Sequence, residues 1–245
     1  MFTEIDKKKL LLDNYRTLPK HAVKSIREQL LLEWTYNSNA MEGNTLSLME
    51  TKVVLEGITI GGKTLREHLE VVNHKDAIIY IEEIVSAQEP LREWQIKNIH
   101  RLVLKAINDK YAGIYREQQV MIAGAEHVPP EPILIKQQMT NFIKWYNTDA
   151  KSLHPLEMSA MVHIIFMGIH PFVDGNGRTS RLLLNLELMK NGYPPVVIRA
   201  ENRLEYYNAL DRAHTIGDNK DFIEIVVDEL NKTFDLYLKE KKPSS

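Results

Sequence analysis

Apolar residues recur at three- and four-residue steps through most of the chain, which is the spacing of one buried face of an α-helix. Such patterns cover about residues 23–39, 90–107, 133–146, 155–169, 201–216 and 221–239, and a further one ends near Lys190. The first 20 residues or so are predicted to be a charged arm. Because nearly every connection between the patterns is short, they predict a compact all-α fold.

Two more helices are predicted from their start signals. Ser47 and Glu50 have the spacing of a capping box, in which a hydroxyl and a carboxylate each bind a free N–H group of the first turn. Thr64 and Glu67 repeat this spacing. The first of these helices is expected to be short and to end at Gly57, and the second to continue to about residue 88.

Residues 113–130 interrupt the helical pattern. The apolar run Val120, Met121 and Ile122 is followed by Gly124 and, further on, by two adjacent prolines, a combination typical of short strands joined by a turn. One small β-hairpin is therefore predicted within an otherwise helical fold.

Composition and charge narrow the range of functions. The chain has 245 residues, 44% of them hydrophobic, and is long enough for one large domain or for one domain with a helical extension. Its net charge of −2 favours neither nucleic acid nor a membrane surface, and the absence of cysteine excludes disulfides. With no signal-peptide pattern and no apolar run long enough to span a bilayer, a cytoplasmic location is expected.

The densest group of chemically useful residues lies in the connection between two apolar helices and at the start of the second. A helix start presents unpaired N–H groups and the positive end of the helix dipole. Gly175 and Gly177, on either side of Asn176, allow an anion such as phosphate to approach the backbone closely. Arg178 and Arg181 are three residues apart, so both side chains are expected to point at one polyphosphate.

Two further residues of this connection suit a reaction. His170 can take up a proton near neutral pH without a shifted pKa, as a general base requires. Asp174 offers hard carboxylate oxygens, which suit Mg2+ bound together with substrate phosphates. The alternative is a polar loop that does no more than cap a helix.

The stretch from His170 to Arg181 matches the pattern HPFx(D/E)GNGRxxR at every defined position, and through it the chain resembles the Fic family. The resemblance extends over about residues 34–238. It implies the Fic fold, with an N-terminal helical region at 1–110 and a catalytic core at 111–245 that carries the hairpin as its flap. It also implies transfer of AMP from ATP-Mg2+ to a Ser, Thr or Tyr hydroxyl of a target protein.

The same resemblance implies roles for individual residues. His170 is expected to remove the proton of the target hydroxyl, and Asp174 to hold the metal ion. Tyr206 and Tyr207 are similar to a tyrosine pair near the nucleotide's base and ribose, although helix packing would explain them equally well. The residues expected to bind the phosphates are Gly175, Asn176, Gly177, Arg178 and Arg181.

Ser38, Glu42 and Gly43 resemble the family's inhibitory motif, (S/T)xxxE(G/N), at the end of a predicted helix of about residues 23–43. Its position before the Fic core is similar to that in the single-chain, self-inhibited subgroup. We expect Glu42 to form an ion pair with Arg181 and to compete there with the γ-phosphate of ATP. The alternative is an ordinary helix end with a glycine stop.

The hairpin residues Val120, Met121 and Ile122 are similar to the family's flap, which aligns a segment of the target protein by pairing with it as an edge strand. The alternative is a surface hairpin without this role.

Two other features of the sequence resemble functional motifs. Gly57 to Thr64 fits the P-loop formula GxxxxGK[ST], but a P-loop follows a strand, whereas here Gly57 is predicted to end one helix and Thr64 to begin the next. His154, His163 and His170 lack the spacing of a zinc-binding helix, so no zinc site is expected. His163 is predicted to be a core residue with a satisfied hydrogen bond.

Three functions are compatible with these residues. The first is a protein adenylyltransferase that Glu42 inhibits, and the second is a de-AMPylase that uses Glu42 at the same site. The third is a non-catalytic nucleotide-sensing module, against which His170 argues because binding needs no base. The expected partners are ATP and a protein of unknown identity, with the chain itself as one candidate; no nucleic acid or membrane is expected, and a homodimer is left open.

Overall fold

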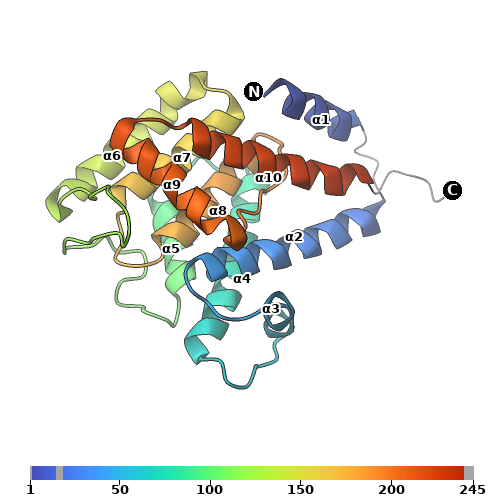
Figure 1. Ribbon diagram of the computed structural model, residues 1–245, viewed down its shortest axis with the longest axis horizontal. Coiled ribbons are helices and arrows are strands. Elements are labelled where there is room, and N and C mark those ends of the chain that lie inside the picture. Colours follow the sequence, from blue (N-terminus) through green and yellow to red (C-terminus); the bar gives the residue numbers. More distant parts are fainter. Residues whose placement is uncertain (1, 15–18, 240–245) are drawn as a thin grey trace.

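The computed structural model describes residues 2–14 and 19–239 (Figure 1). The α-helices in these residues are α1 Thr3–Asn14, α2 Lys20–Met41, α3 Leu48–Leu55, α4 Leu65–Ser86, α5 Glu93–Leu104, α6 Ile135–Asn147, α7 Pro155–Ile169, α8 Asn176–Lys190, α9 Arg203–Ile216 and α10 Lys220–Lys239. Short 3₁₀ turns occupy Pro132–Leu134, Asp149–Ser152 and Ala200–Asn202. The predicted all-α class is confirmed. In the part of the chain described, no helix combines the length and apolar character needed to cross a membrane.

Helices α7 and α8 pack against each other at the centre of the fold, and the other helices surround them (Figure 1). Helix α8 also contacts α2, α4 and α5, so that its residues from Asn176 to Leu188 are all buried. Helix α7 contacts α6, α9 and α10. The loop that joins this central pair is therefore held by buried helices on both sides.

Both predicted capping boxes are present. Ser47 Oγ accepts a hydrogen bond from Glu50 N at 3.2 Å, and the Glu50 carboxylate accepts one from Ser47 N at 2.7 Å. Thr64 begins α4 in the same way. Gly57 follows the last residues of α3 with a φ of +88°, and the residues before it are helical. The stretch that fits the P-loop formula is thus a connection between two helices, as predicted.

The prediction of a charged arm at the N-terminus is wrong for the residues described, because Thr3–Asn14 forms helix α1. This helix packs against α10, where Ile5 is completely buried and Lys8 Nζ pairs with Asp235 at 2.8 Å. Ile5 is the one residue of this helix that is buried, so its apolar periodicity in the sequence is weak. Residues 15–18, at the end of the predicted arm, lie outside the described part of the chain.

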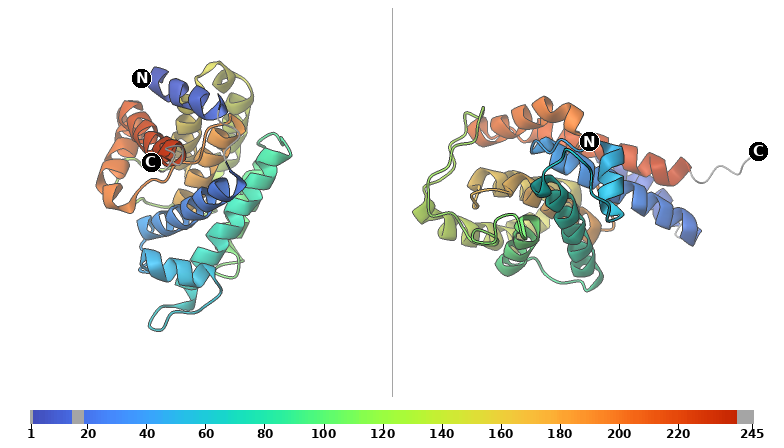
Figure 2. Two further views of the ribbon diagram at one scale, coloured as in Figure 1. Left: turned by 90° about the vertical axis from the view of Figure 1, so that its right-hand side faces the viewer. Right: turned by 90° about the horizontal axis from the view of Figure 1, so that it is seen from below.

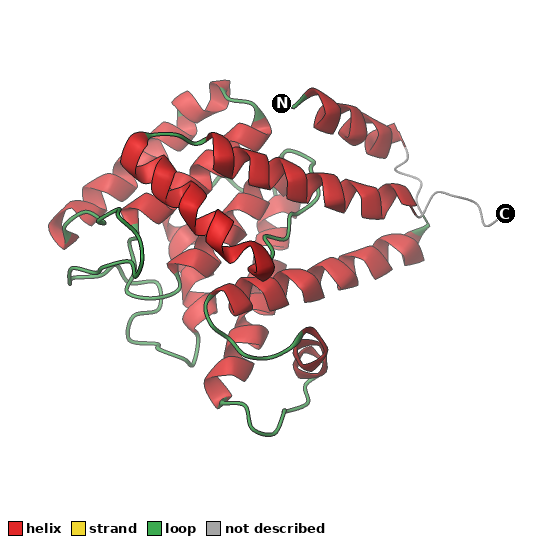
Figure 3. Ribbon diagram, in the orientation of Figure 1, coloured by secondary structure: helices red, strands yellow, loops and turns green. Residues whose placement is uncertain are grey.

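The predicted β-hairpin at residues 113–130 is also wrong. No strand occurs in residues 2–14 and 19–239, and this segment is an irregular loop at the end of the helical body opposite the last turn of α10 (Figures 2 and 3). A hairpin needs two strands that exchange backbone hydrogen bonds along their length. Here the backbone instead closes a turn, from Ala125 N to Ile122 O at 3.2 Å.

Side chains anchor this loop in place of a strand ladder. Arg116, which is 2% exposed, donates from Nη2 to Pro130 O at 2.6 Å and from Nε to His170 O at 2.9 Å. Asp211 of α9 accepts a hydrogen bond from His127 N at 2.9 Å. The loop is therefore tied both to the α7–α8 connection and to α9.

Candidate active site

The connection between α7 and α8 reverses the chain over a few residues. His170 follows α7 in the left-handed region, with φ 48° and ψ 58°, and Gly175 precedes α8 with φ 79°. Residues other than glycine adopt this region rarely, so the surroundings must hold His170 there. Phe172 is completely buried and stacks on His100 with ring centroids 3.6 Å apart. Packing of Phe172 and the backbone turn together position the imidazole.

Asn176 closes this loop with its side chain. Its Oδ1 accepts a hydrogen bond from Phe172 N at 3.0 Å, and its Nδ2 donates to Phe172 O at 2.8 Å. The amide group is thus used within the loop. The groups that the first turn of α8 can offer to a ligand beside this loop are therefore backbone N–H groups.

The imidazole of His170 is uncharged at neutral pH. Burial lowers the pKa of His170 to about 4, and the nearby guanidinium of Arg116 acts in the same direction. Its Nδ1 is buried and makes no hydrogen bond of good geometry. The nearby backbone of Met167 raises the pKa of His170, but by less than burial lowers it. A neutral histidine in this position can accept a proton.

A pocket of about 490 Å³ lies in front of this loop. Helix α9, the end of α2 and part of the 113–130 loop form its other walls. Ten residues predicted for the site line it: Glu42, Ile122, His170, Asp174, Gly175, Asn176, Gly177, Arg181, Tyr206 and Tyr207. Five others, Ser38, Gly43, Val120, Met121 and Arg178, lie outside its lining.

A more open cavity of about 540 Å³ lies between α9 and α10. Its lining contains five carboxylates and no basic side chain: the acidic residues are Glu201, Glu205, Asp221, Glu224 and Asp228. Such a surface repels a polyphosphate, so the pocket beside His170 is the candidate nucleotide site.

Arg181 is bound by the end of helix α2. Its Nη2 lies 2.7 Å from Glu42 Oε1 and 2.8 Å from Ser38 O, and its Nε donates to Ser38 Oγ at 3.0 Å. Burial disfavours the charged form of Arg181, but Glu42 and Tyr206 outweigh this effect and raise its pKa. Gly43 has a φ of +93° and terminates the helix directly after Glu42. The expected ion pair between Glu42 and Arg181 is therefore present.

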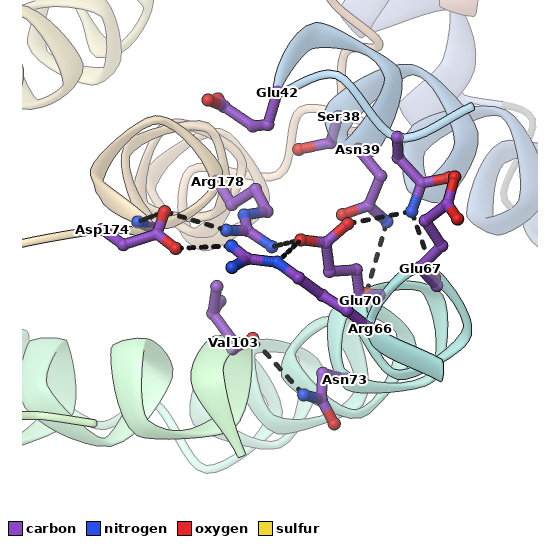
Figure 4. Close-up of polar contacts among 12 residues, drawn as sticks. Ser38, Asn39, Glu42, Arg66, Glu67, Glu70, Asn73, Val103, Asp174 and Arg178 are labelled. Atoms are coloured by element: carbon purple, nitrogen blue, oxygen red, sulfur yellow. Dashed lines mark hydrogen bonds and ion pairs between the residues drawn. The ribbon is translucent and has the colours of Figure 1, made fainter. Parts of the chain in front are cut away.

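Asp174 belongs to a closed ring of four alternating charges, which we call the ion-pair ring: Asp174, Arg66, Glu70 and Arg178 (Figure 4). Arg66 Nη2 lies 2.7 Å from Asp174 Oδ2, and Arg178 Nη2 lies 3.2 Å from Asp174 Oδ1. Burial would raise the pKa of Asp174, but Arg178, the Gly175 N–H and Arg66 together lower it. Asp174 is therefore a carboxylate at neutral pH.

The two arginines of the signature point to different neighbours. Arg181 contacts α2, whereas Arg178 lies 3.3 Å from Glu70 of α4 and is 1% exposed. Arg178 is a buried partner of Asp174. In this conformation Arg178 and Arg181 therefore do not point at one common place, as had been expected for binding a single polyphosphate.

The tyrosine pair is also divided between two environments. Tyr206 is completely buried, and its hydroxyl lies 2.9 Å from His163 Nε2 and 3.4 Å from Arg181 Nη1. Tyr207 is 38% exposed and donates to Met41 O at 3.3 Å. His163 is a core residue as predicted and also lies 3.0 Å from Ser180 Oγ, but its Nδ1 has no partner.

Sequence patterns did not single out several residues that shape the site. Arg66 and Glu70 lie in α4, and His100 in α5 contacts Asp174 O at 2.8 Å through Nε2. Arg116 lies in the segment 113–130, for which the sequence predicted only a hairpin. An i, i+4 arginine–glutamate pair on a helix is too common in surface helices to have marked a site.

Comparison with known proteins identifies relatives of this chain. The Fic/DOC family model matches residues 90–188. The protein adenylyltransferase Fic of Nematostella vectensis is 39% identical over 243 residues, which are 97% of this chain and 56% of that protein. The enzyme of the same name from Drosophila grimshawi is 38% identical over 219 residues, covering 89% of this chain and 45% of the relative. The chain spans about half the length of the curated relatives it matches.

Solved structures share the whole architecture. Fic-1 of C. elegans superposes with a TM-score of 0.86 at 32% identity, covering 99% of this chain and 74% of that one. A Fic domain containing signaling protein from Bacteroides thetaiotaomicron superposes with a TM-score of 0.85 at 28% identity, covering 99% of both chains. With the HPFVDGNGRTSR loop, the helical fold around it and these relatives in agreement, the chain belongs to the Fic family.

Proposed function

We propose that this protein is an adenylyltransferase that moves AMP from ATP to a Ser, Thr or Tyr hydroxyl of a protein. The observation that carries the proposal is the meeting of an uncharged His170, the N-terminus of α8 and Arg181 in one pocket. The names of the relatives support the same activity. This combination provides a base beside a phosphate site, which is what transfer to a hydroxyl requires.

His170 is the proposed general base. It takes the proton of the hydroxyl while the hydroxyl oxygen forms a bond to the α-phosphorus of ATP. The bond between the α-phosphorus and the bridging oxygen to the β-phosphorus breaks, and pyrophosphate leaves with the electron pair of that bond. A base of this kind typically contributes about 10²–10⁴-fold to the rate. Its low pKa keeps the imidazole unprotonated at neutral pH.

The phosphates of ATP are proposed to lie over the first turn of α8. Gly175, Asn176 and Gly177 line the pocket at the positive end of the helix. The N–H groups of Asn176 and Gly177 are the proposed phosphate donors, because the Gly175 N–H is bonded to Asp174 Oδ1. Arg181 supplies a fixed cation once Glu42 has left it. We assign the side chain of Asn176 to holding the loop in shape, because both of its polar atoms are bonded to Phe172.

Asp174 is the proposed ligand of Mg2+. It is ionised and 39% exposed, and its hard oxygens fit this cation. When bound, the cation would neutralise charge on the α- and β-phosphates. In residues 2–14 and 19–239, no three His, Cys, Asp or Glu side chains are grouped to hold a metal ion. The remaining ligands would therefore come from the nucleotide and water.

The remaining predicted residues keep supporting roles in this proposal. Tyr207 lines the pocket where the base or ribose would lie, with Tyr206 packed beneath it. Residues Val120, Met121 and Ile122 are proposed to receive the target segment. The Met121 side chain is 88% exposed and available for such a contact.

A second activity, the removal of AMP from a modified protein, is favoured by one observation. Glu42 lines the same pocket as His170, and its side chain is 30% exposed. A carboxylate there could activate a water molecule toward the AMP–protein bond. Offering the parent protein an AMP-modified substrate and measuring AMP release tests this activity directly.

The proposed transfer is tested by incubating the parent and Glu42→Gly proteins with ATP and Mg2+ and measuring each intact mass. Addition of one or more AMP groups, absent from His170→Ala in the Glu42→Gly background, is the expected result. Parallel incubations with GTP, CTP and UTP establish the nucleotide. If Glu42→Gly binds ATP in calorimetry but modifies neither itself nor any protein of a cell lysate, the chain is a nucleotide-binding module instead.

A further inference from the structure

The proposed metal ligand is already neutralised by the protein's own cations. Asp174 Oδ2 is bound by Arg66 at 2.7 Å. Asp174 Oδ1 accepts hydrogen bonds from Gly175 N at 2.6 Å and from Arg178 at 3.2 Å. A divalent cation that accompanies ATP therefore meets a carboxylate with both oxygens engaged.

The two arginines on Asp174 differ in how readily they can leave it. The side chain of Arg178 is 2% exposed, whereas that of Arg66 is 57% exposed. Withdrawing a buried guanidinium from its carboxylate leaves an uncompensated charge in a poorly solvated place, which is costly. An exposed pair contributes little, since water replaces the partner. Arg66 is therefore the cation that another cation can replace.

Glu70 holds the other side of the ion-pair ring. Its side chain is 9% exposed, and its Oε1 lies 3.0 Å from Arg66 Nε and 3.3 Å from Arg178 Nη1. Its Oε2 accepts a hydrogen bond from Asn44 at 2.9 Å, which fixes the carboxylate. Arg66 thus uses Nε for Glu70 and Nη2 for Asp174, so it can release Asp174 while it stays bound to Glu70.

We propose that Arg66 is a built-in, displaceable cation at the metal site, and that Glu70 is the positioning residue that makes the exchange possible. The inference rests on the proposed function of Asp174. In the free protein, Arg66 keeps Asp174 paired. When the cation of ATP-Mg2+ takes its place on Asp174, Arg66 turns toward solvent on its Glu70 contact, and Glu70 continues to balance the buried Arg178.

Opposite effects follow from removing the two charges. Arg66→Gln removes the competitor, so the gain in nucleotide affinity that Mg2+ provides should rise by about two- to five-fold, as expected for an exposed ion pair. Glu70→Gln leaves two guanidinium groups to bind one carboxylate, and the gain should fall by about ten-fold, as is usual for partners of metal ligands. In the double variant the ring is neutral again, so the gain should return toward that of the parent.

The test is calorimetric titration of each protein with a non-hydrolysable ATP analogue, once with Mg2+ and once with EDTA. The ratio of the two dissociation constants gives the contribution of Mg2+ to affinity, separate from any effect of the substitution on binding of the nucleotide alone. Arg27→Gln is the matched control. Arg27 is an exposed arginine that also pairs with a glutamate of α4, Glu82, but neither residue belongs to the ion-pair ring. Thermal melting of each variant checks that it is folded.

The outcomes separate this inference from the function on which it rests. A larger ratio for Arg66→Gln and a smaller one for Glu70→Gln, with Arg27→Gln like the parent, would support it. If the parent shows a gain with Mg2+ that Arg66→Gln leaves unchanged, the displaceable cation is ruled out while the proposed function stands. A parent that binds no nucleotide with or without Mg2+ overturns both.

Discussion

Glu42 Oε1 and Arg181 Nη2 lie 2.7 Å apart and join the end of α2 to the middle of α8 across one side of the pocket. The same carboxylate oxygen lies so close to Gly177 that a Cβ at this position would collide with it. A side chain at 177 would therefore push the Glu42 carboxylate out of its observed position beside Arg181, and the missing Cβ also lets a phosphate approach the backbone. The contact was expected from the sequence and is confirmed, whereas its inhibitory effect remains a prediction.

Replacing Glu42 by glycine should raise AMP incorporation by on the order of 10²-fold. With the carboxylate gone, Arg181 can bind the γ-phosphate, and an error of about 1 Å in placing the α-phosphate costs a rate factor of this size. Incorporation of AMP from labelled ATP is the measurement. The parent, Glu42→Gly and Glu42→Gln are compared, since glutamine keeps the size of the side chain and removes its charge.

Two results would argue against inhibition through this residue. One is equal incorporation by the parent and Glu42→Gly. The other is incorporation by Glu42→Gly that persists after His170→Ala is added, because the label would then arise outside the proposed site.

Replacing His170 by alanine should abolish transfer and leave the ATP dissociation constant within about two-fold of the parent, because the imidazole is assigned to proton removal. Calorimetry and an incorporation assay in the Glu42→Gly background give the two readouts. The rate in that background should vary little from roughly pH 6 to pH 8, since a base with a pKa of about 4 is uncharged throughout this range. A steep fall in rate from pH 7.5 to pH 6 would contradict the assignment.

The folded protein should lose stability as the pH falls from about 6.5 towards 4.5. Burial lowers the pKa of five histidines below the value near 6.5 of an unfolded chain: His74, His100, His163, His170 and His214. In this window the unfolded state binds more protons, and each fully shifted group contributes up to about 1.4 kcal/mol per pH unit. Urea unfolding at pH 7.5 and 5.5 measures the loss.

A pair of variants tests the origin of that loss. His74→Gln removes one buried histidine and should reduce the difference between the two pH values, whereas His21→Gln changes an exposed histidine and should not. The same pH dependence in the parent and His74→Gln would mean that this residue does not contribute.

Arg116→Gln should destabilise the fold by about 2–4 kcal/mol, because it leaves the carbonyl oxygens of His170 and Pro130 without their charged donor. The 113–130 loop should also become more sensitive to limited proteolysis, since one of its anchors is lost. Arg101→Gln is the control, because this exposed arginine of α5 donates to Asn98. Equal unfolding midpoints for the two variants would show that Arg116 does not anchor the loop.

The sequence by itself determined the helices of the core and located most of the residues that line the candidate site. Periodicity and capping residues are local signals, which is why α2 and both capping boxes were predicted close to their observed positions. His170 and Asp174, which line the candidate site, could be singled out for the same reason, since the signature that contains them is contiguous. The motif around Glu42 was found from a second short stretch, and its expected contact with Arg181 proved correct.

Tertiary structure decided what depends on partners distant in the sequence. Helix α1 forms against α10, and the 113–130 loop takes its course from Arg116 and Asp211 because no strand ladder supports it. The ion-pair ring closes only when α4 brings Arg66 and Glu70 to α8. The periodicity of a single helix does not show which distant residues its side chains will contact. The environment of Asp174 was therefore visible only in the folded structure.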